Sequence, residues 1–402
     1  MAAKPEQVSK MATLPPLRFT GAHILRDGAL RRDALSVDNG RITEAALPEV
    51  DLTGYLVLPG IVDLHGDAFE RHIAPRPSAP FPIESGLRTT ERDAAAHGAT
   101  TAWLAQSWSW EGGLRSPDFA EALMAELDAF RPGALLDMRL QIRLETHLPE
   151  TRDRLIGAVT RHGIDYVIFN NHLPEALLMA SHAPHKLAAW AEREGKPVDA
   201  FADKLERARA RAGEVPRHLL KLAEAFDRLG ITYGSHDDPD GDTRERFRML
   251  GARIAEFPTT FNAAAAAKAM KDPVIMGAPN VVRGGSQSGN VAAMSLIARG
   301  HCDVLVSDYH YPSLAEAAWV LADAGLRSLP DAWAMISATP ARIMRLADRG
   351  RLDRGMRADF VVIHEETRRI EATISAGRIA HLSGALAHRF LSGNRNLRLA
   401  AE

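Results

Sequence analysis

The sequence has little of several features that define common protein classes. It holds one cysteine, Cys302, which excludes an intrachain disulfide and a zinc site built from several cysteines. No apolar run reaches the length that crosses a membrane, and the first residues lack the hydrophobic stretch of a signal peptide. We therefore expect a cytoplasmic protein that has no membrane partner.

Excess charge of either sign is also absent. The 402 residues carry 49 lysines and arginines against 51 acidic residues, which gives a formal net charge of -2. Sequence-independent binding to nucleic acid requires an excess of positive charge, so no nucleic-acid partner is expected. Any polyanion has to be held by a local site. Hydrophobic residues make up 46% of the chain, enough for one barrel-sized domain and a smaller one.

Both ends of the chain are rich in short strands and turns. Residues 17–56 contain the hairpin signal Asp38-Asn39-Gly40, and residues 346–402 contain a second turn at Ser375-Ala376-Gly377. Two such ends around one long middle predict that the ends meet and form a single small β-module. Residues 1–16 are polar and contain prolines, so we expect a flexible leader there.

The middle of the chain, residues 57–345, alternates apolar runs with helical stretches such as Pro117–Phe130 and Asp199–Arg228. This pattern is typical of parallel strands joined by crossover helices. Eight strands are predicted: Val57–Leu64, Ala99–Gln106, Met138–Glu145, Asp165–Asn170, Ile231–Ser235, Arg253–Phe257, Val274–Gly277 and Val304–Ser307. Eight such units predict an α/β protein with a (β/α)8 TIM-like barrel. The rival, a doubly wound sheet, usually opens with a glycine-rich nucleotide turn that this sequence lacks.

Metal-ligand residue types collect where the predicted strands end, which is where barrels carry their active sites. The set comprises His65, Asp67, Glu145, His172, His236 and Asp308. Buried carboxylates cluster at high cost unless a cation compensates them, so we predict a metal site. We expect two divalent metal ions, and zinc, manganese and iron(II) suit these ligands equally. The spacing leaves the number of ions and the bridging carboxylate open.

The ligand set predicts metal-assisted hydrolysis. A divalent ion lowers the pKa of a bound water to about 7, and a carboxylate beside that water can take its proton. We assign this role to Asp308, with His236 as the other catalytic residue. The alternative for Asp308 is a ligand that has no part in proton transfer.

A glycine-rich segment, MGAPNVVRGGSQSGN, follows the predicted seventh strand. Glycines let backbone N–H groups approach an anion, and barrel loops in this place often bind phosphate. The predicted anion ligands are Arg283, Gly284, Gly285, Ser286, Ser288 and Asn290. Arg71, His72 and Arg76, just after the first ligand pair, are predicted to meet a second anionic group. The alternatives are a flexible glycine loop and an ordinary surface loop.

These segments together resemble a known superfamily. LPGIVDLHGDAFERH, the later strand-end residues and PARIMRLADRGRLDRGMRADFVVI are similar to the amidohydrolase superfamily, in which a metal-bearing barrel carries a small β-sandwich built from both termini. DLHGDAFERHIAPRP, SHDD, GAPNVVRGGSQSGN and SDY resemble the alpha-D-ribose 1-methylphosphonate 5-triphosphate diphosphatases of the carbon–phosphorus lyase pathway of phosphonate utilisation.

The resemblance implies a hydrolase that splits a ribosyl phosphonate 5-triphosphate, a small phosphorylated substrate, into the 5-phosphate and pyrophosphate. Gln287 and Asn171 stand where that family tends to carry His and Asp, which leaves the substrate open. His172 and His236 follow the fourth and fifth predicted strands, whereas the superfamily places its single histidines on the fifth and sixth. We therefore expect one strand to be missed or wrongly assigned.

Two other functions remain open. A relative that cleaves a C–N bond, such as an amino-sugar deacetylase or a deaminase, would use similar ligands. A metal-free scaffold would keep the barrel without catalysis. The products separate the first from a diphosphatase, and metal affinity separates the second. The sequence does not fix the oligomeric state, although homo-oligomers are common among such barrels.

Overall fold

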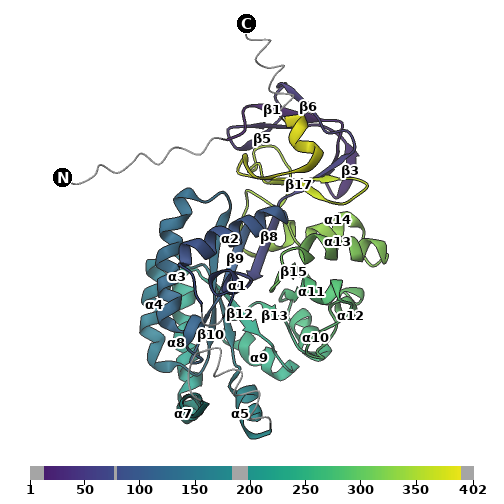
Figure 1. Cartoon of the computed structure of the whole chain (residues 1–402). Helices are drawn as coiled ribbons and strands as arrows, with labels where there is room; N and C mark the ends of the chain where they lie inside the picture. The colour runs from purple at the N-terminus through teal and green to yellow at the C-terminus, as the bar shows by residue number, and fades with distance from the viewer. Residues whose placement is uncertain (1–12, 77–78, 183–197, 391–402) are drawn as a thin grey trace, which may run out of the picture.

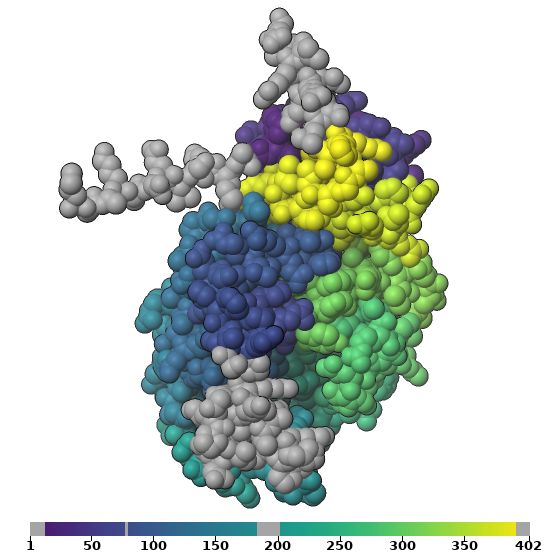
Figure 2. All heavy atoms as spheres, in the orientation of Figure 1, coloured from purple at the N-terminus to yellow at the C-terminus, as the bar shows by residue number. Residues whose placement is uncertain are grey.

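The chain forms two lobes in the computed structural model, which describes residues 13–76, 79–182 and 198–390 (Figure 1). The larger lobe is a barrel of parallel strands surrounded by helices. The smaller lobe combines strands from both ends of the chain, coloured purple and yellow (Figure 2). No helix in these three ranges is long and apolar enough to cross a membrane.

The barrel sheet has the order β15-β14-β13-β12-β11-β10-β9-β8, so every strand pairs in parallel with its neighbours in sequence. Its strands are β8 (Ile61–Gly66), β9 (Ala99–Trp108), β10 (Asp137–Glu145), β11 (Tyr166–Asn170), β12 (Thr232–His236), β13 (Ala255–Glu256), β14 (Val274–Gly277) and β15 (Val304–Val306). The predicted α/β barrel with eight strands is confirmed. The expectation of a missed or wrongly assigned strand is wrong, because the described chain supplies these eight in the predicted order.

One predicted strand has different bounds. The run Val57–Leu64 is two strands, β7 (Tyr55–Pro59) and β8, and β7 pairs antiparallel with β16 (Phe360–His364) of the smaller lobe. The chain passes from one lobe to the other at Gly60. A Cβ atom there would lie 2.4 Å from the side chain of Thr100, so only glycine fits this crossing.

The barrel closes between its first and last strands. Asp63 on β8 is fully buried and accepts hydrogen bonds from the backbone N–H and the hydroxyl of Ser307, at 2.9 and 2.6 Å. The Asp308 N–H donates to the His65 carbonyl at 2.9 Å, and the Asp67 N–H donates to the Asp308 carbonyl at 2.8 Å. Closure therefore brings together three predicted ligands that lie far apart in sequence.

Fourteen helices are described, most of them around the barrel (Figure 1). They are α1 (Phe69–Ile73), α2 (Ile83–Ala96), α3 (Pro117–Phe130), α4 (Arg152–Arg161), α5 (Leu173–His182), α7 (Val198–Ala210), α8 (Val215–Leu229), α9 (Gly241–Met249), α10 (Phe261–Ala269), α11 (Ala278–Val282), α12 (Ala293–Ala298), α13 (Ser313–Asp323), α14 (Leu329–Ala334) and α15 (Ala338–Ile343).

The helix predictions are confirmed in part. Helix α3 has the predicted bounds, and its Ser116 cap accepts from the Phe119 N–H. The stretch Asp199–Arg228 is not continuous, because a 3₁₀ turn at Ala212–Glu214 separates α7 from α8. Pro216 in the first turn of α8 favours a new helix start there, since proline has no backbone N–H to donate to the preceding turn.

The smaller lobe contains two sheets that pack face to face. One has the order β5 (Arg41–Thr43), β4 (Leu35–Asp38), β1 (Leu17–Thr20), β6 (Glu49–Asp51). The other has the order β18 (Arg378–Leu382), β17 (Ile370–Ser375), β16, β7, β2 (His23–Arg26), β3 (Ala29–Arg32). Buried Phe19, Val37, Phe360 and Ile374 form part of their common core. The predicted β-sandwich built from both ends of the chain is thus confirmed.

The last residues of the expected leader, residues 1–16, contact the smaller lobe. Leu14 is buried and donates its backbone N–H to the Gly377 carbonyl at 2.7 Å, which fixes it to the turn between β17 and β18. Positions 1–12 of the expected leader and 391–402 of the expected sandwich segment lie outside the described residues.

Candidate active site

A cavity of about 750 Å³ opens at the carboxyl ends of the barrel strands. It is lined by His65, Asp67, His172, His236 and Asp308 of the predicted ligand set and by residues of the glycine-rich loop after β14. Residues that were predicted separately, as metal ligands and as phosphate ligands, therefore line the same cavity.

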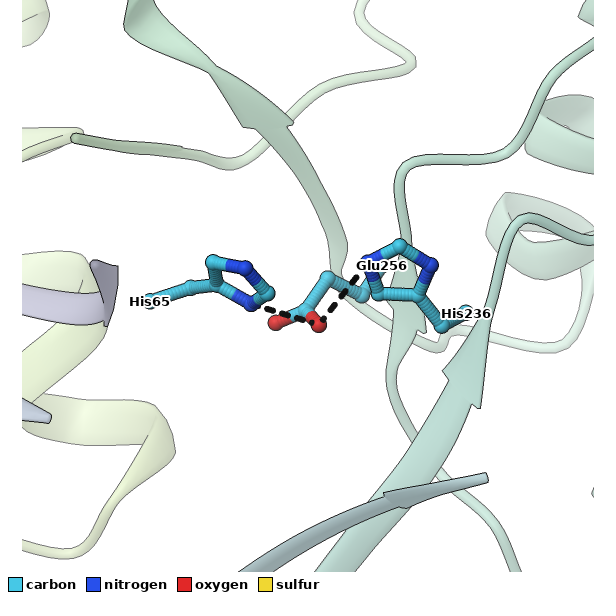
Figure 3. A group of neighbouring side chains, drawn as sticks. All are labelled: His65, His236 and Glu256. Atoms are coloured by element: carbon cyan, nitrogen blue, oxygen red, sulfur yellow. Dashed lines mark hydrogen bonds and ion pairs between the residues drawn. The ribbon is translucent and has the colours of Figure 1, made fainter. Parts of the chain in front are cut away.

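Glu256 lies at the centre of the ligand cluster, between two histidine rings (Figure 3). Its Oε2 atom is 2.9 Å from His65 Nδ1 and 3.7 Å from His236 Nε2. Its Oε1 atom accepts from Gln141 Nε2 at 2.8 Å and from the Tyr166 hydroxyl at 3.3 Å. The carboxylate is fully buried. Burial opposes charge on His65, but the carboxylate outweighs it and raises the pKa of that imidazole.

Several buried polar atoms of this cluster have no hydrogen-bond partner. They are His65 Nε2 and both ring nitrogens of His236. His236 Nδ1 is 2.9 Å from Asp237 Oδ2, yet the two groups are not oriented for a hydrogen bond. Buried donors and acceptors without partners are costly, and imidazole with carboxylate is a ligand set for divalent metals. The residues present therefore fit divalent metal ions.

Asp67 and Asp308 form a second group with His65, in which one ligand atom from each residue lies within 4.8 Å of the others. Burial and the neighbouring Asp67 carboxylate raise the pKa of Asp308 to about 7. Arg143 on β10 is 8% exposed, and its Nη1 atom lies 3.7 Å from Asp67 Oδ2. A buried guanidinium thus offsets part of the negative charge at this end of the cavity.

Glu145 and His172 form a third group with Glu111. The His172 ring Nδ1 is 2.6 Å from Glu145 Oε1, and its backbone N–H donates to Glu145 Oε2 at 3.1 Å. Burial opposes the charged ring, but Glu145 and Asp237 raise the pKa of His172 to about 10. Asp237 lies 3.8 Å from His172 Nε2 and 2.9 Å from His236 Nδ1, so it links this group to the central cluster.

Left-handed backbone follows three barrel strands at the cavity. Asp237, Phe257 and Asp308 have φ values of 57°, 51° and 55°. Such values are unfavourable for side chains other than glycine and cluster at functional sites. The ring of Phe257 then packs edge-on against His65 and His236, with centroids 5.0 Å apart in both cases.

The glycine-rich loop borders the cavity on the β14 side. Arg283 is exposed and donates from Nη1 to Gln287 Oε1 at 3.3 Å and to the Tyr309 hydroxyl at 3.2 Å. Gly285, Ser286, Ser288 and Asn290 line the cavity with it, whereas Gly284 is not among the lining residues. Both departures from the family pattern, Gln287 and Asn171, also face this cavity.

The residues predicted to meet a second anionic group lie outside this cavity. Arg71 and Arg76 are exposed, and neither they nor His72 line the cavity. His72 faces α2, where its Nδ1 atom is 2.9 Å from the Thr90 hydroxyl. The structure therefore does not bring these side chains to the ligand cluster.

Sequence reasoning missed Glu256, Arg143, Glu111 and Asp237. Glu256 ends the sixth strand, so it fits the same criterion as the other predicted ligands, a metal-binding residue type at the end of a strand. It lies on the strand where the superfamily resemblance led us to expect a second single histidine. Arg143 lies two residues before Glu145 on β10, the spacing that His65 and Asp67 share. Glu111 follows the longer β9 and carried no such signal.

The chain shares its fold with solved structures that include an amidohydrolase from an environmental sample of the Sargasso Sea, with TM-score 0.59, 15% identity, and coverage of 96% of this chain and 98% of that one. Solved structures with this fold include N-acetylglucosamine-6-phosphate deacetylase from Pasteurella multocida, with TM-score 0.61, 12% identity, and coverage of 90% of this chain and 99% of that one. The 5-methylcytosine deaminase from Klebsiella pneumoniae has TM-score 0.60 and 14% identity, with 92% and 98% covered. No family model matches the chain.

A curated relative narrows the class. Alpha-D-ribose 1-methylphosphonate 5-triphosphate diphosphatase of Escherichia coli (strain K12) is 32% identical over 352 residues, which cover 84% of this chain and 92% of the relative. The chain belongs to the family of this diphosphatase.

Proposed function

We propose that the protein hydrolyses a phosphoanhydride of alpha-D-ribose 1-methylphosphonate 5-triphosphate, the substrate in its relative's name, to the 5-phosphate and pyrophosphate. The observation that carries the proposal is the shared cavity of about 750 Å³, with His65, His236 and Asp308 on one side and Arg283 and Ser286 on another. A triphosphate requires positive charge both at the attacked phosphorus and at the leaving pyrophosphate.

The residues that would hold divalent ions are His65, Asp67, Glu145, His172, His236 and Asp308, joined by Glu256. We propose two ions, of zinc, manganese or iron. When bound, they would lower the pKa of the attacking water and offset the charge of the phosphates. The unpartnered ring atoms of His65 and His236 support this assignment, because no protein group otherwise satisfies them.

The chain's own residues have distinct tasks in this proposal. Asp308, beside Asp67 and His65, takes the proton of the attacking water on its carboxylate. His236 positions that water within the central cluster. Arg143 lines the cavity, where a guanidinium can hold a phosphate oxygen near the ligands. Arg283 and the serines of the glycine-rich loop bind the distal phosphates.

The competing proposal is hydrolysis of a C–N bond, the chemistry of a deacetylase or deaminase. Those activities belong to neighbours of 12% and 14% identity, whose likeness to this chain is one of fold alone. Three arginines line the cavity here, Arg143, Arg246 and Arg283. Five carboxylates also line the cavity, and bound metal ions would offset their charge, which would leave the guanidinium groups to favour a polyphosphate over an uncharged amide or base.

Product analysis tests the proposal. Protein loaded with zinc or manganese is incubated with alpha-D-ribose 1-methylphosphonate 5-triphosphate, ATP, N-acetylglucosamine 6-phosphate and cytosine, and pyrophosphate, acetate and ammonia are measured. We expect pyrophosphate from the ribosyl triphosphate and its loss in His236→Ala. Release of acetate or ammonia without pyrophosphate would replace the proposal. Bound metal is counted in both proteins, because an inactive preparation without metal does not test the substrate.

A further inference from the structure

A second cavity lies at the opposite end of the barrel from the candidate active site. Its volume is about 410 Å³, within the range of small-molecule sites. It is lined by residues that precede β12, β13, β14 and β15, and by the end of α15. Buried Ile168, Ile275 and Met344 are among the side chains that fill the barrel interior between the two ends. The two cavities are therefore separate.

Positive charge dominates this second cavity. Its cations are Arg253, Lys268, Lys271, Arg342 and Arg345, against the two carboxylates Asp227 and Asp303. Both carboxylates already have partners within the protein. Lys268 Nζ lies 2.7 and 2.8 Å from the two oxygens of Asp303, and the Tyr233 hydroxyl donates to Asp227 Oδ1 at 3.0 Å.

The other four cations make no ion pair with any described carboxylate. Arg342 lies in the last turn of α15, and Arg345 and Lys271 directly follow the residues that cap α15 and α10, so all three lie at helix ends where positive charge is stabilising. That explanation does not extend to Arg253, which precedes β13. Four like charges around one cavity repel one another, and a bound anion would relieve that repulsion.

We propose that this second cavity binds a small anion carrying phosphate groups. Arginine forks match phosphate oxygens in geometry, and lysine adds a point charge. This assignment stands independently of the reaction proposed for the candidate active site.

Lysine footprinting with inorganic pyrophosphate tests the site directly. Lys268 and Lys271 line the second cavity, whereas no lysine lines the candidate active site, so their acylation reports on this cavity alone. We expect pyrophosphate to slow acylation of Lys271 at least fivefold, measured by mass spectrometry. Exposed Lys221 on α8 is the internal control, and its rate is expected to stay unchanged.

Matched variants assign the effect to the cavity. Arg253→Ser combined with Arg342→Ser is expected to weaken protection of Lys271 at least tenfold, and Arg345→Ser alone several-fold. Arg217→Ser, at an exposed position on α8, is expected to leave it unchanged. Protection should persist in His236→Ala. Sodium chloride at the same ionic strength could protect Lys271 equally well, or the double variant could keep full protection. Either result would mean that the basic residues are merely solvated, and it would overturn the proposal.

Discussion

His65 Nδ1 lies 2.9 Å from Glu256 Oε2, and this contact joins the first barrel strand to the sixth. Because a carboxylate only accepts, the ring must donate from Nδ1, which leaves the lone pair on Nε2. That second nitrogen is buried and has no hydrogen-bond partner. Glu256 thus prepares His65 to bind a metal ion through Nε2, whether or not Glu256 is itself a ligand.

Replacing Glu256 with glutamine tests this preparation. Glu256→Gln keeps the shape but removes the charge that fixes the His65 ring, so zinc affinity should fall about 10- to 100-fold. The measurement is competitive titration against a chromogenic chelator. Glu316→Gln, at an exposed position on α13, is the control and should bind zinc as the unmodified protein does. Unchanged affinity in Glu256→Gln would remove Glu256 from the metal site.

Gly66, between His65 and Asp67, is expected to tolerate no side chain. A Cβ atom there would lie 2.7 Å from Ser307 Oγ and 3.0 Å from Asp63 Oδ2, the two groups that close the barrel. Gly66→Ala should lower the free energy of unfolding by about 1–3 kcal/mol. Urea unfolding measures the change.

Gly157 supplies the matched control, because it lies inside α4 and a Cβ atom added there would have no other atom within 4 Å. Gly157→Ala should raise the free energy of unfolding by about 0.5–1 kcal/mol through helix propensity. If both variants change the free energy of unfolding in the same direction, the close contacts at Gly66 are not what excludes a side chain there, and the prediction fails.

His218 on α8 predicts a loss of stability in acid. It is 2% exposed and neither ring nitrogen has a partner. Burial, with help from Arg152 and Arg211, lowers its pKa to about 4. In the unfolded chain the histidine has its ordinary pKa of about 6.5. The free energy of unfolding therefore decreases as the pH falls from about 6.5 toward 4, and this histidine does not change it above about pH 6.5.

The variant His218→Leu removes this proton linkage. When the pH is lowered from 7.5 to 5, the unmodified protein should lose about 2 kcal/mol more of its unfolding free energy than the variant does. Urea unfolding of both proteins at the two pH values gives the difference, in which acid effects common to both cancel. A constant difference across the two pH values would mean that His218 is already charged in the folded state.

The sequence predicted the barrel well because strand and helix periods are local signals. Eight apolar runs gave all eight strands, and the turn at Asn39 and Gly40 formed between β4 and β5 as expected. The boundary at Gly60 was missed, since Val57 and Leu64 are equally apolar whether they lie in one sheet or two. Pairing between β7 and β16, which are distant in sequence, decides that boundary.

The site was predictable where one residue ends one strand. His65, Asp67, His172, His236 and Asp308 meet because parallel strands end at the same edge. Directions of side chains after a strand were not predictable, because they depend on packing of the following helix. Asp67 directly follows β8, whereas Arg71 lies on the next helix, α1, and its side chain is exposed.

Arg283 and Arg71 therefore give opposite predictions for substrate binding. Arg283 lines the cavity beside Gln287 and Tyr309, whereas Arg71 is exposed outside it. A charge-assisted hydrogen bond to phosphate contributes about 1.5–3 kcal/mol, so Arg283→Ser should raise KM for the triphosphate roughly 10- to 100-fold. Because the loop holds distal phosphates in ground and transition states alike, kcat should change much less.

Arg71→Ser serves as the comparison, with KM expected within twofold of the unmodified protein. Initial rates of pyrophosphate release over a range of substrate concentrations give both constants. A large effect of Arg71→Ser and none of Arg283→Ser would place the phosphates along α1 instead of the loop after β14. A fall in kcat at constant KM in Arg283→Ser would instead assign the arginine to the transition state at the attacked phosphorus, next to Asp308 and His236.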